Sequence, residues 1–348
     1  MFVVTYRNMD EIHMKRLPLG IGVVLCLNLA GAAGQNLPQV QAATNAQEKL
    51  VVDMSIDELR RYYRSECSNL VFDSNQGELP SILKTAGAGV EALFRDLSNT
   101  SSKEQVLLQN RSAIVKRQQS RLPGSISTEQ PASSSEEFYY LLLPAPPEAG
   151  AGIGRGRTTL YSGVPWKEER VDKRGRPVDL KRLSNFAITS GFAFHCIYLH
   201  PQHQAGSRFR YLGRENRSGL RVIAFAQKPE IPDYLTAYVN ESISVQYLVQ
   251  GFIWLHPDNY QIVRIETRMI SPAGPLERQS TKVDYREFHF EGISQSFWLP
   301  SEVTVEMKVQ GVVYHNWHRY SDYHLFDIQS DYKILPPKAK DASPKPTR

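Results

Sequence analysis

The sequence predicts an α+β protein in which helices near the N-terminus pack on or near an antiparallel sheet. Apolar residues recur at helical spacing within residues 50–120, and from about residue 137 apolar and polar residues alternate with a period of two. Short turns separate the alternating runs, which is typical of a strand meander. We therefore expect a helical segment over residues 50–120 and an antiparallel β domain over residues 137–335.

The composition is that of an ordinary globular protein. Of the 348 residues, 41% are hydrophobic and 22% are charged, which is enough apolar material for a packed core. The formal net charge of +5 is mild, and basic residues are scattered among acidic ones. Nucleic-acid binding needs a concentrated basic face, so no nucleic-acid partner is expected.

The N-terminal residues 1–33 have the three parts of a secretory signal peptide. Starting at about Met14, two basic residues precede the apolar run Leu17–Ala30, and a small-x-small cleavage motif ends at Ala32. The apolar run is shorter than the ~20 residues that cross a bilayer. Leu25 directly before Cys26 argues against a lipoprotein signal. We expect a periplasmic or secreted protein with no transmembrane span in its mature chain.

Three helices are predicted after this leader. Ser55 and Glu58 have the spacing of a capping box, and apolar residues continue at helical spacing from Ile56 to Leu70. The segment Pro80–Leu97 has proline near its first turn and one apolar face. A second capping-box spacing, in residues 101–104, predicts a more polar helix through about residue 118. Such helices need an apolar partner, and the sheet is the expected one.

Two segments interrupt the pattern and one ends it. Residues 121–136 are rich in Ser, Pro and Glu and predict a linker. Residues 144–157 contain several glycines, but Arg155 occupies the place of a required glycine and no Lys-Ser/Thr pair follows. A loop is favoured over a phosphate-binding site, so no nucleotide cofactor, and no other cofactor, is expected. The tail 336–348, rich in Lys and Pro, is expected to be disordered.

The strands of the β domain follow from alternation and turn residues. The predicted strands are Phe138–Leu143, Thr159–Ser162, Trp166–Val171, Phe192–His200, Arg208–Leu212, Arg221–Gln227, Ile243–Val249, Gly251–Leu255 and Tyr260–Ile270, with another through Val303–Val309.

One face of this sheet is expected to be apolar and the other polar. Its apolar side chains, which are the candidate ligand-binding residues, are Val263, Ile265, Met269, Val303, Val305, Met307 and Val309. Such a face can pack helices as plain core, or curl into an incomplete barrel that holds an acyl chain. The alternation is the same in both cases, although plain core is the commoner outcome.

No catalytic or metal site is predicted. No His-x-His pair occurs, and His200 and His203 form only a weak HxxH signal. On a strand, His195 and Cys196 would point to opposite sides and could not form a catalytic pair. The two cysteines after the leader, Cys67 and Cys196, are read as buried thiols in preference to a disulfide.

Several motifs together resemble a known group of proteins. Gly251-Phe-Ile-Trp254, Tyr260-Gln-Ile-Val-Arg264 and Leu299-Pro300 resemble the LolA/LolB-like superfamily of outer-membrane lipoprotein-sorting-like proteins. Phe209–Gly213, Val222–Gln227 and Trp317–Tyr323 look like exported bacterial proteins of unassigned function. The resemblance implies a half-open antiparallel barrel with a helical lid and, as partner, a lipid or lipoprotein held between them.

Three functions remain open from the sequence. The first is an exported protein, not an enzyme, that binds a lipid or a lipoprotein acyl group in its half-barrel. The second is an envelope module with the same fold and a filled core, which acts through its surface. The third is an exported hydrolase, which no motif requires. The oligomeric state has no signal in the sequence.

Overall fold

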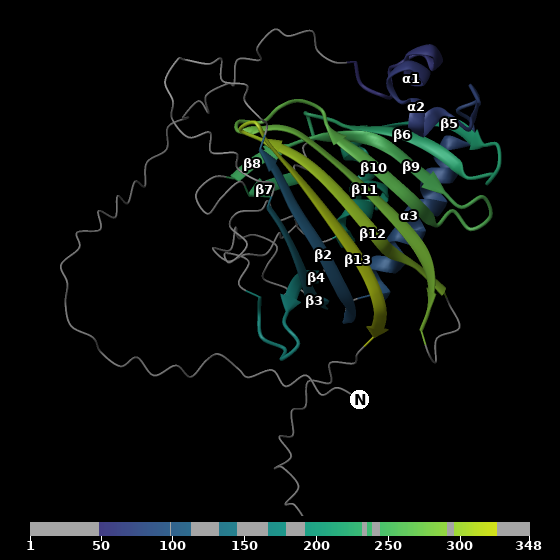
Figure 1. Cartoon of the computed structure of the whole chain (residues 1–348). Helices are drawn as coiled ribbons and strands as arrows, with labels where there is room; N and C mark the ends of the chain where they lie inside the picture. Colours follow the sequence, from purple (N-terminus) through teal and green to yellow (C-terminus); the bar gives the residue numbers. More distant parts are fainter. Residues whose placement is uncertain are drawn as a thin grey trace, which may run out of the picture.

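The structure is a computed structural model of the whole chain (Figure 1). It describes residues 49–97, 99–112, 132–144, 166–178, 192–231, 235–238, 244–290 and 296–325. Several predictions lie outside these residues: the signal peptide, the strand Thr159–Ser162, the glycine-containing loop and the C-terminal tail.

The chain forms one antiparallel sheet of 11 strands in the order β1-β5-β6-β9-β10-β11-β12-β13-β2-β3-β4, with a separate β7-β8 pair. The α+β class with an antiparallel half-open barrel is confirmed. The strands are β1 Leu70–Phe72, β2 Thr100–Ser112, β3 Ala132–Pro144, β4 Trp166–Val171, β5 Ser207–Glu215, β6 Arg221–Gln227, β7 Leu235–Tyr238, β8 Ser244–Tyr247, β9 Val249–Leu255, β10 Ile262–Met269, β11 Leu276–His289, β12 Ser296–Val309 and β13 Val312–Leu325.

The C-terminal strands β9 to β13 form the predicted meander, each pairing with the next. The turn between β12 and β13 is made by Gln310 and Gly311, both with positive φ (48° and 82°), as a two-residue hairpin turn of right-handed twist requires. Beyond β13 the sheet is extended by β2, β3 and β4, which come from earlier in the chain. Strands distant in sequence therefore meet at the β13–β2 pair.

Strand β2 corrects the prediction of a third helix. Residues 100–112 are extended and pair with β13 and β3 along their length. On β2, Ser102, Glu104, Val106 and Leu108 are all buried, so the true period is two. A glutamate at an inward position hid that alternation, while Ser101 and Glu104 imitated a capping box. Strand β3 begins at Ala132, so the linker prediction is also wrong for residues 132–136.

Three α-helices lie near one end of the sheet (Figure 1). They are α1 Ile56–Tyr62, α2 Arg64–Cys67 and α3 Leu79–Asp96. The capping box of α1 is confirmed, since Glu58 N donates to Ser55 Oγ and Ser55 N donates to Glu58 Oε2. The single helix predicted from Ile56 to Leu70 is wrong in extent, because the backbone breaks at Tyr63 and Leu70 begins β1.

The predicted strand Phe192–His200 is a 3₁₀ helix instead, η3 Phe192–Leu199, followed by the short η4 Gln204–Gly206. An apolar run of this length fits a buried strand and a buried helical segment equally, and periodicity does not separate them. This difference matters, because η3 lies in the core rather than in the sheet.

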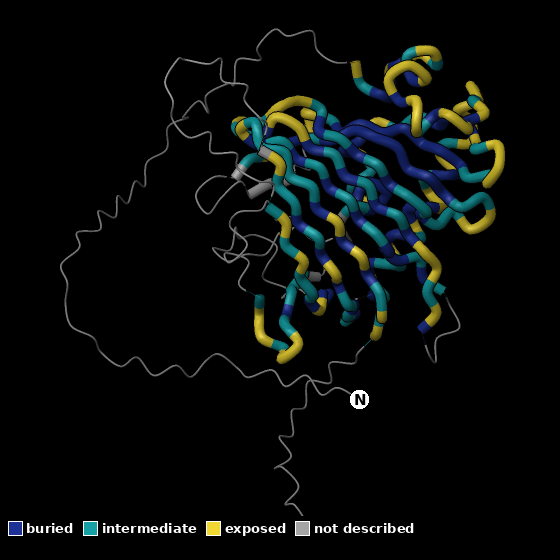
Figure 2. The backbone as a smooth tube through the Cα atoms, in the orientation of Figure 1, coloured by how far each residue is buried: buried dark blue, intermediate teal, exposed yellow. Residues whose placement is uncertain are grey.

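Two hydrophobic clusters lie on opposite faces of the sheet. The larger one joins the inner face to α3 and η3, and the smaller one joins the outer face of β5, β6 and β9 to α1 and α2. Strands β6 and β9 are buried at every residue (Figure 2). The prediction of one apolar and one polar face therefore holds for β10 and β12 but is wrong for β6 and β9, because the N-terminal helices cover their outer face.

Among the residues that the structure describes, no helix is long and apolar enough to cross a membrane.

Candidate functional site

The inner face of the sheet carries an apolar row of side chains from directly paired residues. Ile253 of β9 pairs with Ile265, Ile265 with Val283, and Val283 with Val303. All four side chains are buried in the larger cluster. The next partner in the row, on β13, is His318. This row is thus apolar from β9 to β12 and becomes polar at β13.

The candidate ligand-binding residues share this inner face with one exception. The larger hydrophobic cluster contains Ile265, Met269, Val303, Val305, Met307 and Val309. Val263 packs instead against the outer cluster. A register shift between Ile262 and Arg264 in the β9–β10 pair turns Val263 to the opposite face. A bulge of this kind is invisible in the spacing of apolar residues, so the expected placement of Val263 on the same face as Ile265 is wrong.

The inner face is closed by two layers of this chain's own residues. Element η3 contacts β10 and β12, and α3 contacts η3 and β5. Cys196, Ile197, Tyr198 and Leu199 of η3 are buried in the same cluster as the predicted ligand-binding residues. A 3₁₀ run of 8 residues is unusual, because the hydrogen-bond geometry of this helix is poor and most runs end after about 3–4 residues. The element that covers the apolar row is therefore an unusually long 3₁₀ helix and not an α-helix.

A buried polar cluster joins Glu104 of β2, Arg170 of β4, and His318 and Tyr320 of β13, and we call it the Glu104 cluster. Arg170 donates to both carboxylate oxygens of Glu104, from Nε to Oε2 at 2.6 Å and from Nη2 to Oε1 at 2.9 Å. Tyr320 Oη donates to Oε1 at 2.7 Å, and His318 Nδ1 lies 2.8 Å from the same oxygen. The side chain of Glu104 has no exposed surface, and that of Arg170 is 10% exposed. A fully paired ion pair is thus enclosed in the interior.

The ionisation of the Glu104 cluster follows from this geometry. Burial on its own would raise the pKa of Glu104, but the charge of Arg170 and the hydrogen bonds from His318 and Arg170 hold it well below its usual range. The same carboxylate raises the pKa of Arg170 above its ordinary value against the effect of burial. The pair is therefore ionised at every physiological pH.

Aromatic rings surround the ion pair. The Arg170 guanidinium lies 5.6 Å from the centre of the Tyr140 ring, and Tyr140 packs edge to face on Tyr320 at 5.7 Å. Burial raises the pKa of both phenols, so both hydroxyls stay protonated. Burial and the charge of His318 lower the pKa of His195 on η3 to about 4, so its imidazole is neutral near pH 7.

The sequence analysis did not find the Glu104 cluster. Its members lie on three strands that are far apart in the chain, and spacing within one strand reveals none of the contacts. The one available signal was the inward position of Glu104 between Ser102 and Val106. A charged residue at such a position is rarely buried without a partner, so the correct assignment of β2 would have implied a buried cation.

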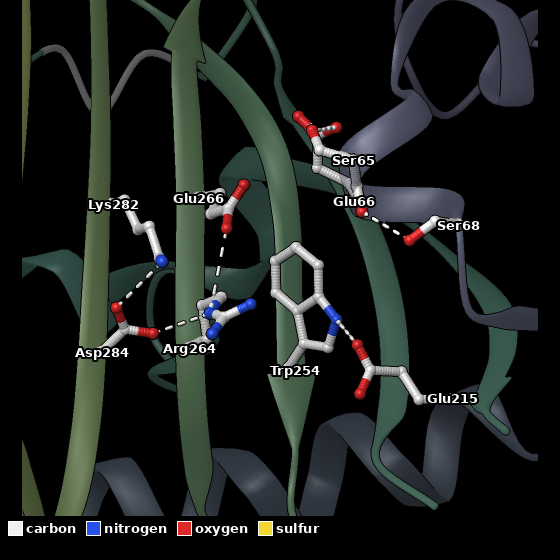
Figure 3. Close-up of polar contacts among 9 residues, drawn as sticks. All are labelled: Ser65, Glu66, Ser68, Glu215, Trp254, Arg264, Glu266, Lys282 and Asp284. Atoms are coloured by element: carbon white, nitrogen blue, oxygen red, sulfur yellow. Dashed lines mark hydrogen bonds and ion pairs between the residues drawn. The ribbon is translucent and has the colours of Figure 1, made fainter. Parts of the chain in front are cut away.

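The outer face carries a second polar network, which is only partly buried (Figure 3). Arg264 lies between two carboxylates, with its Nε 2.7 Å from Asp284 and 3.8 Å from Glu266. The Trp254 indole donates to Glu215 at 3.0 Å, and the Arg264 guanidinium lies 5.6 Å from the Trp254 ring centre. Burial and the nearby charge of Glu66 raise the pKa of Glu266. The network connects β10 and β11 and borders α2. Its contacts hold neighbouring strands together, so we assign it a structural role.

A hollow of about 450 Å³ lies along β12, β13, β2 and β3, and its lining includes the half-exposed Trp317. The Trp317 indole donates to Glu302 at 3.0 Å. The lining mixes acidic and basic side chains and contains none of the predicted ligand-binding residues: Gln105, Val106, Leu107, Ser135, Glu136, Glu137, Glu302, Trp317, His318 and Arg319. This hollow offers a mixed polar surface and not an apolar one.

The structure shows the positions of the histidines and cysteines that the sequence analysis considered. His200 and His203 meet, with ring centres 5.6 Å apart, but no group of three potential metal ligands occurs among the described residues. Cys67 and Cys196 are both buried thiols, in agreement with the favoured prediction. Burial raises the pKa of Cys67 to about 11 and that of Cys196 to about 12, which makes both poor nucleophiles near neutral pH.

No protein-family model matches the sequence. No curated protein matches it either. Among solved structures, the chain is similar to a DUF1329 family protein from Desulfovibrio piger, with 11% identity, a TM-score of 0.33, and coverage of 72% of this chain and 93% of that chain. It is also similar to a domain from Vibrio parahaemolyticus described as an outer membrane lipoprotein-sorting protein, with 13% identity, a TM-score of 0.30, and coverage of 69% and 92%.

Proposed function

We propose that this chain is an exported protein that binds an apolar ligand, a lipid or a lipoprotein acyl group, on the inner face of its half-barrel. The observation that supports this function is the continuous apolar row from Ile253 to Val303, which is covered by the irregular element η3 and not by a regular helix. The ligand takes the place of η3 on that row. Residues Ile265, Met269, Val303, Val305, Met307 and Val309 contact it.

The apolar surface that η3 leaves behind would itself be costly in water, at ~25 cal/mol per Å². A ligand of similar shape removes that cost, so exchange of η3 for an acyl chain is close to balanced. A charged or hydrated ligand would offer no such compensation on this row. This balance favours a long apolar chain over a small polar metabolite.

Cys196 and Cys67 provide a direct test, because both are buried but only Cys196 lies on η3. The full chain with Cys26→Ser is incubated with an oleoyl ligand and then with iodoacetamide, and alkylation is located by mass spectrometry. We expect the ligand to accelerate alkylation of Cys196 by at least about tenfold, while Cys67 on α2 stays protected. Equal protection of both thiols, together with no lipid in the natively purified protein, would rule out the function.

A second candidate is an envelope module with a filled core that acts through its surface. The observation in its favour is the burial of the six inner-face residues by η3 and α3. If the core is permanently filled by η3 and α3, native mass spectrometry should find no co-purifying lipid, and the alkylation rate of Cys196 should not depend on added ligand.

Export is tested separately. If the leader is processed as proposed, N-terminal sequencing of the protein from the envelope fraction of its host should begin just after Ala32. A protein that retains Met14 in that fraction would contradict the signal peptide.

A further inference from the structure

The hollow along β12, β13, β2 and β3 opens on the outer face of the sheet. Side chains alternate between the two faces along a strand, so Trp317 and Arg319 lie on the face opposite to the buried His318. The outer face of β6 and β9 is covered by α1 and α2, whereas Trp317 here is 45% exposed. The volume of about 450 Å³ is within the ~300–1,000 Å³ that is usual for ligand sites. The hollow is therefore large enough for a small ligand or for part of a longer one.

Two rows of side chains cross this face, because their members are direct partners in the sheet. The polar row is Glu302 of β12, Arg319 of β13, Gln105 of β2 and Glu137 of β3. The second row is displaced from it by two residues on each strand and consists of Thr304, Trp317, Leu107 and Ser135. Neighbouring strands are ~4.8 Å apart, so both rows are extended. A line of planar polar groups thus lies beside an indole and an aliphatic side chain.

The Trp317 ring is held at its edge while part of its surface stays open to solvent. The indole Nε1 donates to Glu302 Oε1 at 3.0 Å, although Trp317 is 45% exposed. Leu107, its direct partner on β2, is half-buried beside it. An indole that is fixed by its N–H presents an apolar surface of defined orientation.

Arg319 does not form the ion pair that its position favours. Glu302 is its direct partner on β12, and opposite charges at such positions normally attract each other. One carboxylate oxygen of Glu302 instead accepts from the Trp317 indole. Within the part of the chain that the structure describes, the Arg319 guanidinium and the Gln105 side-chain amide make no hydrogen bond or ion pair. Both donors and acceptors along the polar row are therefore available to a ligand.

The other two carboxylates of the lining have partners. Glu137 pairs with Lys103 at 3.1 Å and with Lys173 at 3.0 Å, and Glu136 Oε1 accepts from Ser134 at 3.0 Å. The lining carries three carboxylates and one guanidinium in all, so it disfavours an anion. What it offers is a mixture of hydrogen-bond donors and acceptors next to an aromatic surface.

From this arrangement we propose that the hollow binds a saccharide, namely an extended and uncharged chain of β-linked hexopyranose units. A pyranose ring with equatorial hydroxyls has C–H groups on its faces and hydroxyls around its rim. One face stacks on the Trp317 indole, and the rim hydroxyls exchange hydrogen bonds with Glu302, Arg319 and Gln105. An extended chain continues along the row across the strands. The site lies on the outer face and is independent of the apolar-ligand function.

The test measures binding of soluble hexasaccharides to the full chain by isothermal titration calorimetry. Chitohexaose and cellohexaose are the uncharged β-linked probes. Maltohexaose is α-linked and coils, and a glucosamine hexamer has the β-linked backbone of chitohexaose with cationic amines. We expect chitohexaose or cellohexaose to bind at least about tenfold more tightly than maltohexaose and the glucosamine hexamer.

Variants of the lining locate the binding. Trp317→Leu removes the aromatic surface and should weaken binding of the β-linked probe at least about twentyfold, whereas Trp317→Phe should weaken it less than about fivefold. Arg319→Gln removes a charged donor and should weaken it at least about fivefold. Two controls lie outside the lining and should leave the affinity unchanged: Tyr62→Leu at an aromatic residue of α1 that is 62% exposed, and Arg111→Gln at an exposed residue of β2.

The absence of binding by both β-linked hexasaccharides overturns the saccharide site. Tighter binding of the glucosamine hexamer would mean that the acidic side chains attract a cation, and equal binding of maltohexaose would mean that an extended chain is not recognised, so either result also overturns it. An unchanged affinity in folded Trp317→Leu protein rejects the hollow as the place of binding. Circular dichroism establishes which variants fold, and Arg319→Gln against Arg111→Gln decides the matter if Trp317→Leu does not.

Discussion

Glu104 is an ionised carboxylate at a fully buried position, where such a residue is rarely found without a partner. Removing an ionised carboxylate from water costs several kcal/mol, and the cost is met only when its oxygens are fully hydrogen-bonded. Here Arg170, Tyr320 and His318 all lie within hydrogen-bonding distance of its two oxygens. Loss of either Glu104 or Arg170 therefore leaves an unpaired buried charge, and the surrounding protein shields the pair from solvent.

Loss of one charge should destabilise the fold far more than loss of an exposed ion pair. Glu104→Gln leaves Arg170 buried and uncompensated, so we expect the free energy of unfolding to fall by about 3 kcal/mol or more. Glu137→Gln, at an exposed pair, should change it by less than about 1 kcal/mol. Urea denaturation followed by circular dichroism measures both. Similar values for the two variants would contradict the enclosed ion pair.

The same carboxylate predicts a direction of pH dependence. The pKa of Glu104 is lower in the folded protein than its ordinary value of 4.5, so its contribution to stability is present above about pH 4.5 and is lost as the pH falls toward the folded pKa. Between pH 7 and about pH 3, the wild-type unfolding free energy should therefore fall more steeply than that of Glu104→Gln. Parallel curves for the two proteins in urea titrations would show that Glu104 does not titrate in this way.

At the scale of elements, Gly251 on β9 explains one of the motif positions seen in the sequence. A side chain built on Gly251 would meet the backbone carbonyl of Glu266 on the neighbouring strand β10. Gly89 on α3 differs, since a Cβ there would make an ordinary contact at 3.6 Å with the Gln261 side chain. Gly251 is therefore required because β10 leaves no space for a side chain, whereas the space around Gly89 would accept one.

Replacement of each glycine by alanine separates these reasons. Gly251→Ala should destabilise the protein by more than about 2 kcal/mol, because β9 and β10 must move apart. Gly89→Ala should be neutral or stabilising by up to about 1 kcal/mol, through the better helix propensity of alanine. Thermal unfolding of the two variants provides the comparison. A tolerated Gly251→Ala would mean that the β9–β10 pair is looser than its register indicates.

Element η3 shows where periodicity fails at this scale. The run Phe192–Leu199 is apolar except at His195, and such a run contains no period to distinguish a strand from a helical segment. The opposite holds for β12, where Val303, Val305, Met307 and Val309 alternate with polar residues and are all buried on one face. Alternation therefore identified β12, whereas the apolar run of η3 gave no period that separates a helical segment from a strand.

At the scale of the whole molecule, the sheet is held by a core on each face. The larger core lies between the inner face, η3 and α3, and the smaller one lies between β5, β6, β9 and the helices α1 and α2. Strands β6 and β9 lie between the two cores, whereas β4 is at the edge of the sheet. We therefore expect β6 and β9 to be the most stable strands of the sheet.

Amide hydrogen exchange should report this asymmetry. We expect the amides of β6 and β9 to exchange slowest, at rates close to those set by global unfolding, and those of β4 to exchange faster by at least about a hundredfold. The measurement is hydrogen–deuterium exchange with mass spectrometry of the full chain. Equal protection of β4 and β9 would show that the edge of the sheet is covered as well as its centre.

The sequence by itself determined the class of the fold, the capping box of α1, the apolar face of α3 and the alternation of β12, because each depends on contacts within a few residues or on a simple period. Only the tertiary structure decided the contacts between distant strands. It paired β13 with β2, buried Glu104 beside Arg170, moved Val263 to the outer face through a bulge, and placed η3 over the apolar row. These features depend on neighbours that are remote in the chain, and local pattern carries no information about them.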